Sequence, residues 1–151
     1  MDDPQAPPPS LTALTTYLLS RTGKTARSRL GARFAARDLR LWHHAVLAAL
    51  ADFGPHAQRE LAVRLAIDPS DMAKILDDLS ALGSVDRARD PADRRRLTVT
   101  LTDEGRALLA ELDAEAAAVQ EEVLAALSGE EREQLNVLLA KVFSHLYPTA
   151  S

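Results

Sequence analysis

The chain has no cysteine, only six aromatic residues and no long apolar run. Without cysteine it cannot form disulfides, use a thiol nucleophile, bind zinc through thiolates or sense oxidants through thiols. No apolar segment approaches the ~20 residues that a membrane-spanning helix needs. The N-terminus, MDDPQAPPPS, is acidic and proline-rich where a secretory signal would be basic and then apolar. We therefore expect a cytoplasmic protein with no membrane partner.

The 151 residues fit one domain, and a hydrophobic content of 46% is enough to bury a core. Charge is divided along the chain. Residues 1–102 carry 15 Lys and Arg against 12 Asp and Glu, a net of +3, whereas residues 103–151 carry 3 against 10, a net of −7. Seven of the basic residues lie between positions 21 and 40. Because salt screens charge beyond about 8 Å, an acidic polymer would meet this local patch and not the whole-chain charge.

Apolar residues at helical spacing predict four helices before residue 83. The first should run from about residue 10, with Ser10 as its N-cap, into the basic segment. The others are expected over about 39–52, 57–66 and 68–82. The fourth has the clearest boundaries, with Asp68 as N-cap, Pro69 at the first helical position and Gly83 at the end.

Two short strands should follow, over about 85–89 and 97–102, because apolar residues alternate with threonine in the second. The segment DPADRRR between them is typical of a loop. Two further helices are expected, one capped by Thr102 and one opened by a capping box of Ser128 and Glu131. The predicted fold is mainly α with a small β-hairpin, in the order four helices, hairpin, two helices.

Two short helices joined by a tight turn and followed by a hairpin with a basic tip are typical of a winged helix-turn-helix. Residues 39–127 resemble the MarR family of bacterial transcription regulators. LRLWHHAVLAAL is similar to the family's second helix, and ELAVRLAIDPSDMAKILDDLSALGSV to its helix-turn-helix. DPADRRRLTVTLTDEGRALL is similar to its wing and the start of its dimer helix, and is the most specific of the three.

The resemblance implies a transcription regulator, by expectation a repressor, that binds a palindromic operator in double-stranded DNA as an intertwined homodimer. Residues 1–9 would form a flexible proline-rich tail and residues 37–102 the DNA-binding lobe. Residues 10–36 and 103–151 would be dimerisation helices. The apolar residues expected on the dimer face are Leu14, Leu18, Leu108, Leu112, Leu138 and Val142.

By the same resemblance, Arg95 would enter the minor groove and Asp93 would orient it. A guanidinium group at a hairpin tip is a weakly hydrated cation that suits the negative potential of a narrow minor groove. Strand alternation turns Arg94 and Arg96 away from Arg95, so both are expected at phosphates. The alternative is a solvated charged turn, which the helix-turn-helix just upstream makes less favoured.

The recognition helix predicted over residues 68–82 has an outward face that is net negative. Ser70 and Lys74 could donate to base edges, Asp71 could accept from a cytosine amino group, and Pro69 and Ala73 could touch a thymine methyl group. For each of these residues the alternative is an exposed position without a base contact. Asp77 or Asp78 could instead hold a wing arginine. Phosphate contacts are then expected mainly from the wing and from Arg37, Arg40, Arg59, Arg64 and Arg87.

Many members of this family are released from DNA by small aromatic or anionic effectors. The resemblance implies an effector cleft lined by the basic first helix and by Trp42, His43 and His44. The two histidines are adjacent on a helix and cannot both face one cleft. Trp42 fits the core better than a ligand platform. We expect no metal and no cofactor, because the four histidines of the chain do not lie at ligand spacing.

The sequence has no Gly-rich phosphate loop, no nucleophile elbow and no catalytic cluster of histidine with carboxylates, so we do not expect an enzyme. The remaining alternative is a winged-helix protein-interaction module with weak or no DNA binding. The acidic recognition helix favours this alternative, whereas the run Asp93-Arg94-Arg95 opposes it. Ser84 stands where the family usually has a bulky apolar residue, which could loosen the first wing strand.

Overall fold

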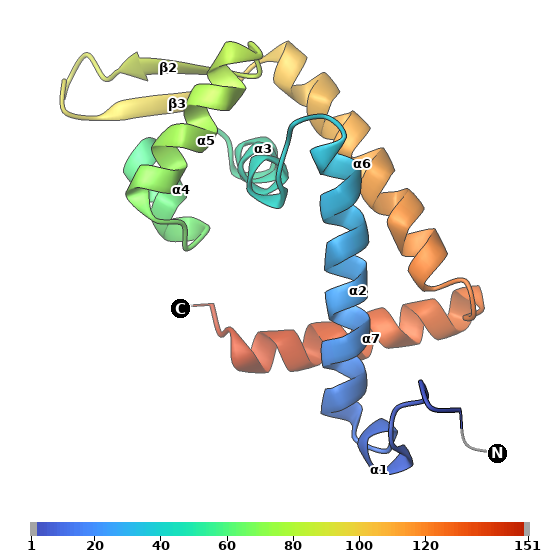
Figure 1. Cartoon of the computed structure of the whole chain (residues 1–151). Coiled ribbons are helices and arrows are strands. Elements are labelled where there is room, and N and C mark those ends of the chain that lie inside the picture. The colour runs from blue at the N-terminus through green and yellow to red at the C-terminus, as the bar shows by residue number, and fades with distance from the viewer. Residues whose placement is uncertain (1–2, 150–151) are drawn as a thin grey trace. The chain divides into compact units, whose positions relative to one another are not determined.

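The computed structural model describes residues 3–149, and Figure 1 shows its elements. The helices are α1 (Pro9–Thr12), α2 (Thr15–Ala35), α3 (Leu41–Phe53), α4 (Gln58–Arg64), α5 (Pro69–Ala81), α6 (Asp103–Val123) and α7 (Gly129–Leu146). The strands are β1 (His56–Ala57), β2 (Val85–Arg89) and β3 (Leu97–Leu101). The mainly helical fold with a winged helix-turn-helix is confirmed.

The chain divides into two compact units. One comprises residues 27–117, and the other joins the segment up to residue 26 with the segment from residue 118 onward. The division falls inside α2 and inside α6. The assignment of 10–36 and 103–151 to dimerisation and of 37–102 to DNA binding is a functional division, and it stays a prediction.

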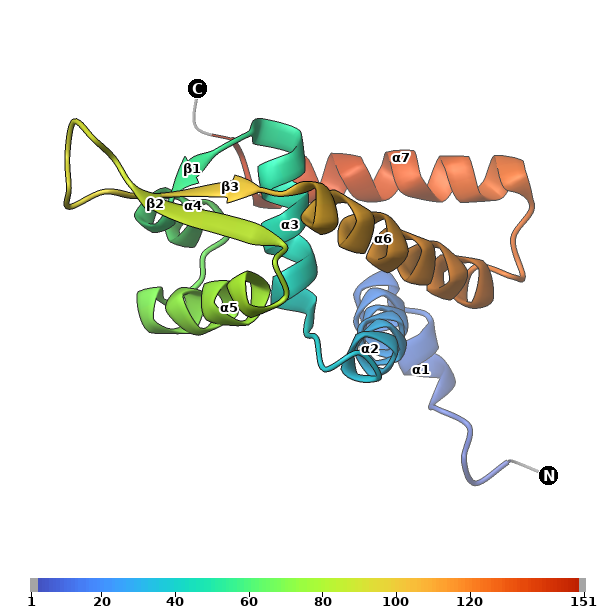
Figure 2. The same ribbon diagram turned by 90° about the horizontal axis from the view of Figure 1, so that it is seen from above.

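A three-stranded antiparallel sheet, with strand order β1-β3-β2, lies in the unit of residues 27–117. Val85 pairs with Leu101 and Arg89 with Leu97, so β2 and β3 are paired over their whole length. Alternation places Val99 in the core. Strand β1 was not predicted, because a strand of two residues has no alternation to detect. Figure 2 shows the loop between β2 and β3 projecting beyond the helices of this unit.

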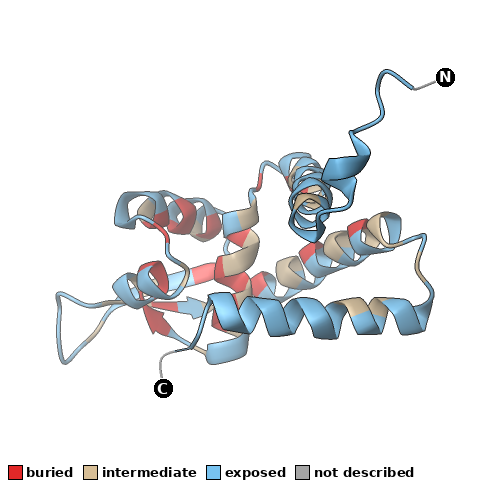
Figure 3. Ribbon diagram, turned by 90° about the horizontal axis from the view of Figure 1, so that it is seen from below, coloured by how far each residue is buried: buried red, intermediate tan, exposed pale blue. Residues whose placement is uncertain are grey.

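The core of the same unit forms where α3, α4 and α5 pack against the sheet, and Figure 3 shows the buried residues gathered there. Phe34 at the end of α2 is a fully buried aromatic residue of this core. Trp42 is 42% exposed, so the expectation that it belongs to the core was wrong. The fully buried side chains of the core include Leu47, Leu50, Leu61, Met72, Leu76, Leu79 and Leu112.

Helix α5 begins and ends where the sequence predicted. The carboxylate of Asp68 accepts from the backbone N–H of Ser70 at 2.8 Å, and Pro69 occupies the first helical position. Hydrogen bonds from the Ser70 hydroxyl and then from its N–H hold the pKa of Asp68 below its ordinary value. Gly83 follows the helix with a φ of +71°, in the left-handed region that favours glycine.

The wing joins α6 through a close backbone contact. The hydroxyl of Thr102 accepts from the N–H of Gly105 at 3.0 Å, which confirms Thr102 as the N-cap of α6, and it donates to the carbonyl of Gly83 at 2.6 Å. Ser84 is buried, and its carbonyl accepts from the N–H of Thr102 at 3.1 Å. Because β2 starts at the next residue and pairs fully, Ser84 does not loosen the strand.

The first predicted helix is broken in two, so the expected continuous helix capped by Ser10 was wrong. Helix α1 starts at Pro9 with Pro8 as its N-cap. Its last turn tightens, because the N–H of Leu14 donates to Leu11 three residues back. The hydroxyl of Thr12 donates to the carbonyl of Pro9 at 3.2 Å. Threonines at 12, 15 and 16 are weak helix formers, which favours the break.

Helix α7 begins with the predicted capping box. The Ser128 hydroxyl accepts from the N–H of Glu131 at 3.2 Å, and the Glu131 carboxylate accepts from the N–H of Ser128 at 2.9 Å. Hydrogen bonds to the Glu131 carboxylate, first from the Ser128 backbone N–H and then from its hydroxyl, lower the pKa of Glu131. Arg132 on α7 pairs with Glu121 on α6 at 2.8 Å, within the same unit.

Candidate nucleic-acid interface

The first half of α5 presents the residues predicted to contact bases. Pro69, Ser70, Asp71 and Lys74 are exposed and Ala73 is half-buried. The opposite face of the helix is in the core. The Ser70 hydroxyl donates to Asp68, so its proton is used in the helix cap. Within residues 3–149, no hydrogen bond or ion pair engages the side chains of Asp71 and Lys74, which leaves both free to meet a ligand.

The two acidic residues in the second half of α5 are held from within the protein. Asp77 accepts from Arg87 of β2 at 2.7 Å, and the Nε of Arg87 also donates to the Ser80 hydroxyl at 3.1 Å. One of the two aspartates therefore holds an arginine of the wing. Asp78 lies 2.9 Å from Nε2 of His43. The negative charge that made α5 an unusual recognition helix is thus largely engaged by neighbouring side chains.

The histidines predicted at an effector cleft contact different helices. His43 is buried, with its Nδ1 accepting from the backbone N–H of Arg40 at 2.8 Å and its Nε2 against Asp78 of α5. His44 lies with its Nε2 2.8 Å from Asp113 of α6 and packs edge-on against Phe34. The expectation that the two rings cannot face the same way is confirmed.

The wing loop is shaped by its own aspartates. The carboxylate of Asp93 accepts from the backbone N–H of Arg95 at 3.1 Å, and that of Asp90 accepts from the N–H of Ala92 at 2.8 Å. Asp93 therefore fixes the backbone that carries Arg95 and does not bind its guanidinium group. Across the loop, the N–H of Asp90 donates to the carbonyl of Arg96 at 2.8 Å.

The three wing arginines differ in their surroundings. Arg96 pairs with Glu60 of α4 at 3.1 Å and lies 3.9 Å from Asp90. Arg94 and Arg95 are exposed, and no ion pair joins either of them to another described residue. The carbonyl of Arg94 accepts from Arg89 at 2.7 Å, which adds support to the loop. Two unpaired guanidinium groups therefore stand on a hydrogen-bonded turn.

Three of the five residues predicted at phosphates have protein partners. Arg37 pairs with Glu111 and Glu115 of α6, and Arg87 with Asp77. Arg64 donates to Nε2 of His56 at 3.0 Å, and its guanidinium carbon lies 4.1 Å above the centre of the Phe53 ring. The side chains of Arg40 and Arg59 are exposed and unpaired within the described part of the chain. All five phosphate contacts stay predictions.

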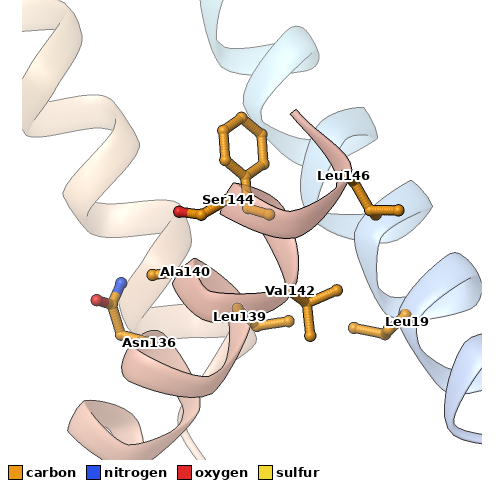
Figure 4. Close-up of a pocket in the computed structure, with 8 residues that line it drawn as sticks. Leu19, Asn136, Leu139, Ala140, Val142, Ser144 and Leu146 are labelled. Atoms are coloured by element: carbon orange, nitrogen blue, oxygen red, sulfur yellow. The ribbon is translucent and has the colours of Figure 1, made fainter. Parts of the chain in front are cut away.

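The residues predicted on a dimer face differ in burial. Leu112 is fully buried in the core of its own unit and Leu108 packs against that core, so neither lies on an exposed apolar face. The side chains that the structure leaves largely exposed are Leu14, Leu18, Leu138 and Val142. A groove of about 480 Å³ in the unit that holds the chain ends is lined by Leu19, Asn136, Leu139, Ala140, Val142, Phe143, Ser144 and Leu146 (Figure 4).

Sequence reasoning missed the contacts that hold α5 and the wing. The partners of Asp78 and Arg96 lie 35 and 36 residues away along the chain, so no local pattern indicates them.

Among the residues that the structure describes, no helix is both long enough and apolar enough to cross a membrane.

The fold and this surface define a winged helix-turn-helix protein. Residues 37–96 match the model of the MarR family. The chain is 36% identical over 108 residues to the transcriptional regulator HosA of Escherichia coli O111:H-, which covers 71% of this chain and 79% of HosA. It is also 36% identical over 96 residues to the HTH-type transcriptional repressor NicR of Pseudomonas putida, covering 64% of this chain but only 61% of NicR.

A solved structure of Bordetella bronchiseptica BpsR, described as showing how 6-hydroxynicotinic acid regulates its DNA binding, is similar over 84% of this chain and 96% of BpsR. The TM-score is 0.70 and the identity 29%. The chain belongs to the MarR family of transcription regulators.

Proposed function

We propose that this protein is a transcription regulator, acting as a repressor, that binds a palindromic double-stranded DNA operator as a homodimer. Helix α5 enters the major groove and Arg95 enters the adjacent minor groove. The observation that supports this most directly is the wing, where Arg94 and Arg95 have no ion pair within the described residues and extend from a loop that Asp90 and Asp93 hold in shape. Unpaired guanidinium groups on a preorganised loop suit a narrow groove lined by phosphates.

In the major groove, the free side chains of α5 are the base readers. Lys74 donates to guanine, and Asp71 accepts from the amino group of cytosine. Pro69 and Ala73 offer apolar contact to a thymine methyl group. Ser70 contributes mainly as an acceptor, because its proton is already given to Asp68.

Phosphate contacts come from the exposed and unpaired side chains of Arg40 and Arg59, together with Arg94 at the wing. The other three arginines make contacts within the protein: Arg37 pairs with Glu111 of α6, Arg64 donates to His56, and Arg87 pairs with Asp77. The alternative of a protein-interaction module was favoured by the acidic face of α5, and the ion pair of Asp77 and the contact of Asp78 with His43 account for that face.

The homodimer is supported by the exposed apolar side chains of α1, α2 and α7, because soluble monomers rarely expose apolar patches larger than a few hundred Å². A small aromatic or anionic effector would release the regulator from DNA, as 6-hydroxynicotinic acid regulates DNA binding by BpsR. The site of action would be the cytoplasm, since a regulator must share a compartment with its operator.

Selection of bound sequences from random duplex DNA tests this proposal. We expect enrichment of a palindrome whose half-sites are centred about one helical turn, ~10 base pairs, apart. Affinity for the selected duplex should fall steeply with salt, with a log–log slope of about −0.9 for each phosphate neutralised. Failure to enrich any motif, together with an affinity for random duplex DNA that does not change with salt, would instead support the protein-interaction module.

A further inference from the structure

The imidazole of His43 joins two elements that carry proposed DNA contacts. Its side chain is 3% exposed. Nδ1 accepts from the backbone N–H of Arg40, just before α3, at 2.8 Å, and Nε2 lies 2.9 Å from a carboxylate oxygen of Asp78 on α5. Because Nδ1 accepts, the proton of the neutral ring is on Nε2, which donates to Asp78. Both ring nitrogens therefore have a partner, and only one tautomer satisfies both.

Asp78 lies on the same stripe of α5 as the proposed base readers. It follows Lys74 by four residues and Asp71 by seven, and residues at these spacings share one face of a helix. A rotation of α5 about its axis that moved Asp78 would therefore move Asp71 and Lys74 by the same angle. The position of the Asp78 carboxylate therefore fixes the direction of the Asp71 and Lys74 side chains.

The hydrogen bond to His43 supplies a directional restraint that apolar packing alone does not. The buried side of α5 consists of Met72, Ile75, Leu76 and Leu79, and the apolar attraction that holds these side chains has no preferred direction. A hydrogen bond weakens steeply when its angle or length departs from the optimum. The ion pair between Asp77 and Arg87 of β2 restrains the neighbouring residue from the wing side. Two adjacent residues of α5 thus connect the helix to two neighbours, Asp78 to α3 and Asp77 to the wing.

We propose that His43 is a positioning residue for sequence recognition, which fixes the rotation of α5 through Asp78 and so aims Asp71 and Lys74 at the bases. His43 is too deeply buried to touch DNA itself. This inference rests on the proposed function, because it concerns how α5 discriminates between base sequences. It assigns to His43 a role in specificity in place of the effector contact that the sequence indicated.

The role predicts an effect on specific binding that is separate from stability and from general affinity. Contacts with phosphates supply almost all of the affinity for a random duplex, and they do not depend on the rotation of α5. Base contacts are directional and do depend on it. Releasing Asp78 from His43 should therefore lower the affinity for the operator and leave the affinity for a scrambled duplex unchanged.

Two substitutions of His43 separate its two hydrogen bonds. His43→Asn places an amide near the position of Nδ1, which keeps the contact with the N–H of Arg40 and loses Asp78. His43→Gln extends an amide to the position of Nε2, which keeps a donor for Asp78. Binding constants are measured for the selected operator and for a scrambled duplex of the same length and composition. All measurements are made at one salt concentration and at a temperature where circular dichroism shows each variant to be folded.

We expect His43→Asn to lower the ratio of operator affinity to scrambled affinity by about tenfold, the loss associated with one hydrogen bond to a charged group. His43→Gln should retain most of the ratio of the unmodified protein. A purely structural role would not separate the two variants in this way, because it would lower the melting temperature without changing the affinity ratio of the folded protein.

A second pair of variants tests the same contact from α5, where the side chain of Asp78 is 61% exposed. Asp78→Ala and Asp78→Asn remove the same negative charge, so any gain in general DNA affinity is common to both. Only Asp78→Asn keeps an acceptor for Nε2. We expect the affinity ratio to fall with Asp78→Ala and to be kept with Asp78→Asn, and the combination of His43→Asn with Asp78→Ala to be no worse than either alone.

An unchanged ratio in folded His43→Asn and Asp78→Ala overturns the inference, as does an equal loss of affinity for both duplexes. If His43→Asn does not fold, the Asp78 pair decides the question. Failure of the unmodified protein to distinguish operator from scrambled duplex would overturn the proposed function itself. That result is obtained before any variant is compared, so the two failures are distinguishable.

Discussion

Arg95 and Arg96 are adjacent in the wing and carry the same charge, but only Arg96 has a carboxylate partner. A free guanidinium group loses less on entering a groove than one that must first break an ion pair. We therefore predict that Arg95→Ala weakens operator binding by about 1–3 kcal/mol. A gel-shift titration against the selected operator measures the loss.

Arg95→Lys is the matched control for this wing prediction. It keeps the charge and loses the planar fork, so it should retain the slope of affinity against salt while recovering only part of the affinity. If Arg95→Ala binds as tightly as the unmodified protein, the wing has no part in recognition.

The N-cap residue Asp68 predicts a dependence of stability on acid. Hydrogen bonds from Ser70 lower the pKa of Asp68 below its ordinary value of 3.8. The ionised carboxylate therefore favours the folded state above that value, and this contribution is lost as the pH falls through the lowered pKa. Asp68→Asn keeps a capping side chain that does not titrate in this range.

Melting temperatures measured from about pH 7 down to about pH 2 test this effect of Asp68. The protein should be more stable than Asp68→Asn at neutral pH, and the two curves should converge at the acid end. A difference that stays constant over the whole range would show that the charge on Asp68 makes no contribution to stability.

Two helical glycines in the unit of residues 27–117 predict opposite responses to alanine. A Cβ at Gly105 in the first turn of α6 would lie 2.1 Å from the carbonyl oxygen of Ser84, and backbone at that distance has to move. A Cβ at Gly31 in α2 would meet nothing within 4 Å. Gly105→Ala should therefore destabilise the protein by about 1–3 kcal/mol. Gly31→Ala should stabilise it by about 0.5–1 kcal/mol.

Urea unfolding of the two glycine variants, compared with the unmodified protein, gives the two free energies. Both substitutions add one methyl group to a helix, so propensity alone would make both stabilising. A stabilising Gly105→Ala would mean that the joint between the wing and α6 is looser than the close approach of Ser84 and Gly105 indicates.

The elements that the sequence predicted well are those whose boundaries are set by neighbouring residues. Helix α5 is the clearest case, because Asp68, Pro69 and Gly83 each act within one turn of a helix end. The capping box of α7 is another. Strand β1 was missed, since its two residues become a strand through pairing with β3, about 40 residues further along.

The candidate site was also predictable where it depends on local sequence. The helical spacing of apolar residues gave the outward face of α5, and the charged segment between two strands gave the basic wing. The partners of the charged residues were not predictable, since Arg37 meets Glu111 across 74 residues and His43 meets Asp78 across 35. Trp42 was assigned to the core because it shares helical spacing with the apolar face of its helix, but it is 42% exposed, and Phe34 is the fully buried aromatic residue instead.

For the whole molecule, the exposed apolar side chains near the two chain ends predict a dimer. Leu138 and Val142 on α7 are 62% and 47% exposed, and Leu14 and Leu18 are similarly open. Placing a carboxylate among such residues costs several kcal/mol if a second copy covers them and little if water does. Leu138→Asp together with Val142→Asp should therefore convert the dimer into monomers.

Sedimentation at micromolar concentration measures this change in mass. Val63→Asp is the matched control, because Val63 on α4 is 82% exposed but belongs to the unit of residues 27–117 and not to the unit that holds the chain ends. The control should remain a dimer. Monomeric behaviour of the unmodified protein at micromolar concentration would contradict the dimer directly.

The same variants connect assembly to DNA binding. When one DNA-binding lobe is bound, the second meets its half-site at a high effective concentration, so the dimer binds the palindrome far more tightly than one lobe binds a half-site. Leu138→Asp with Val142→Asp should weaken binding to the palindrome by at least about tenfold and leave binding to an isolated half-site unchanged. Equal losses on both duplexes would mean that the substitutions damage the lobe itself, and that α7 contributes to folding and not to the pairing of two lobes.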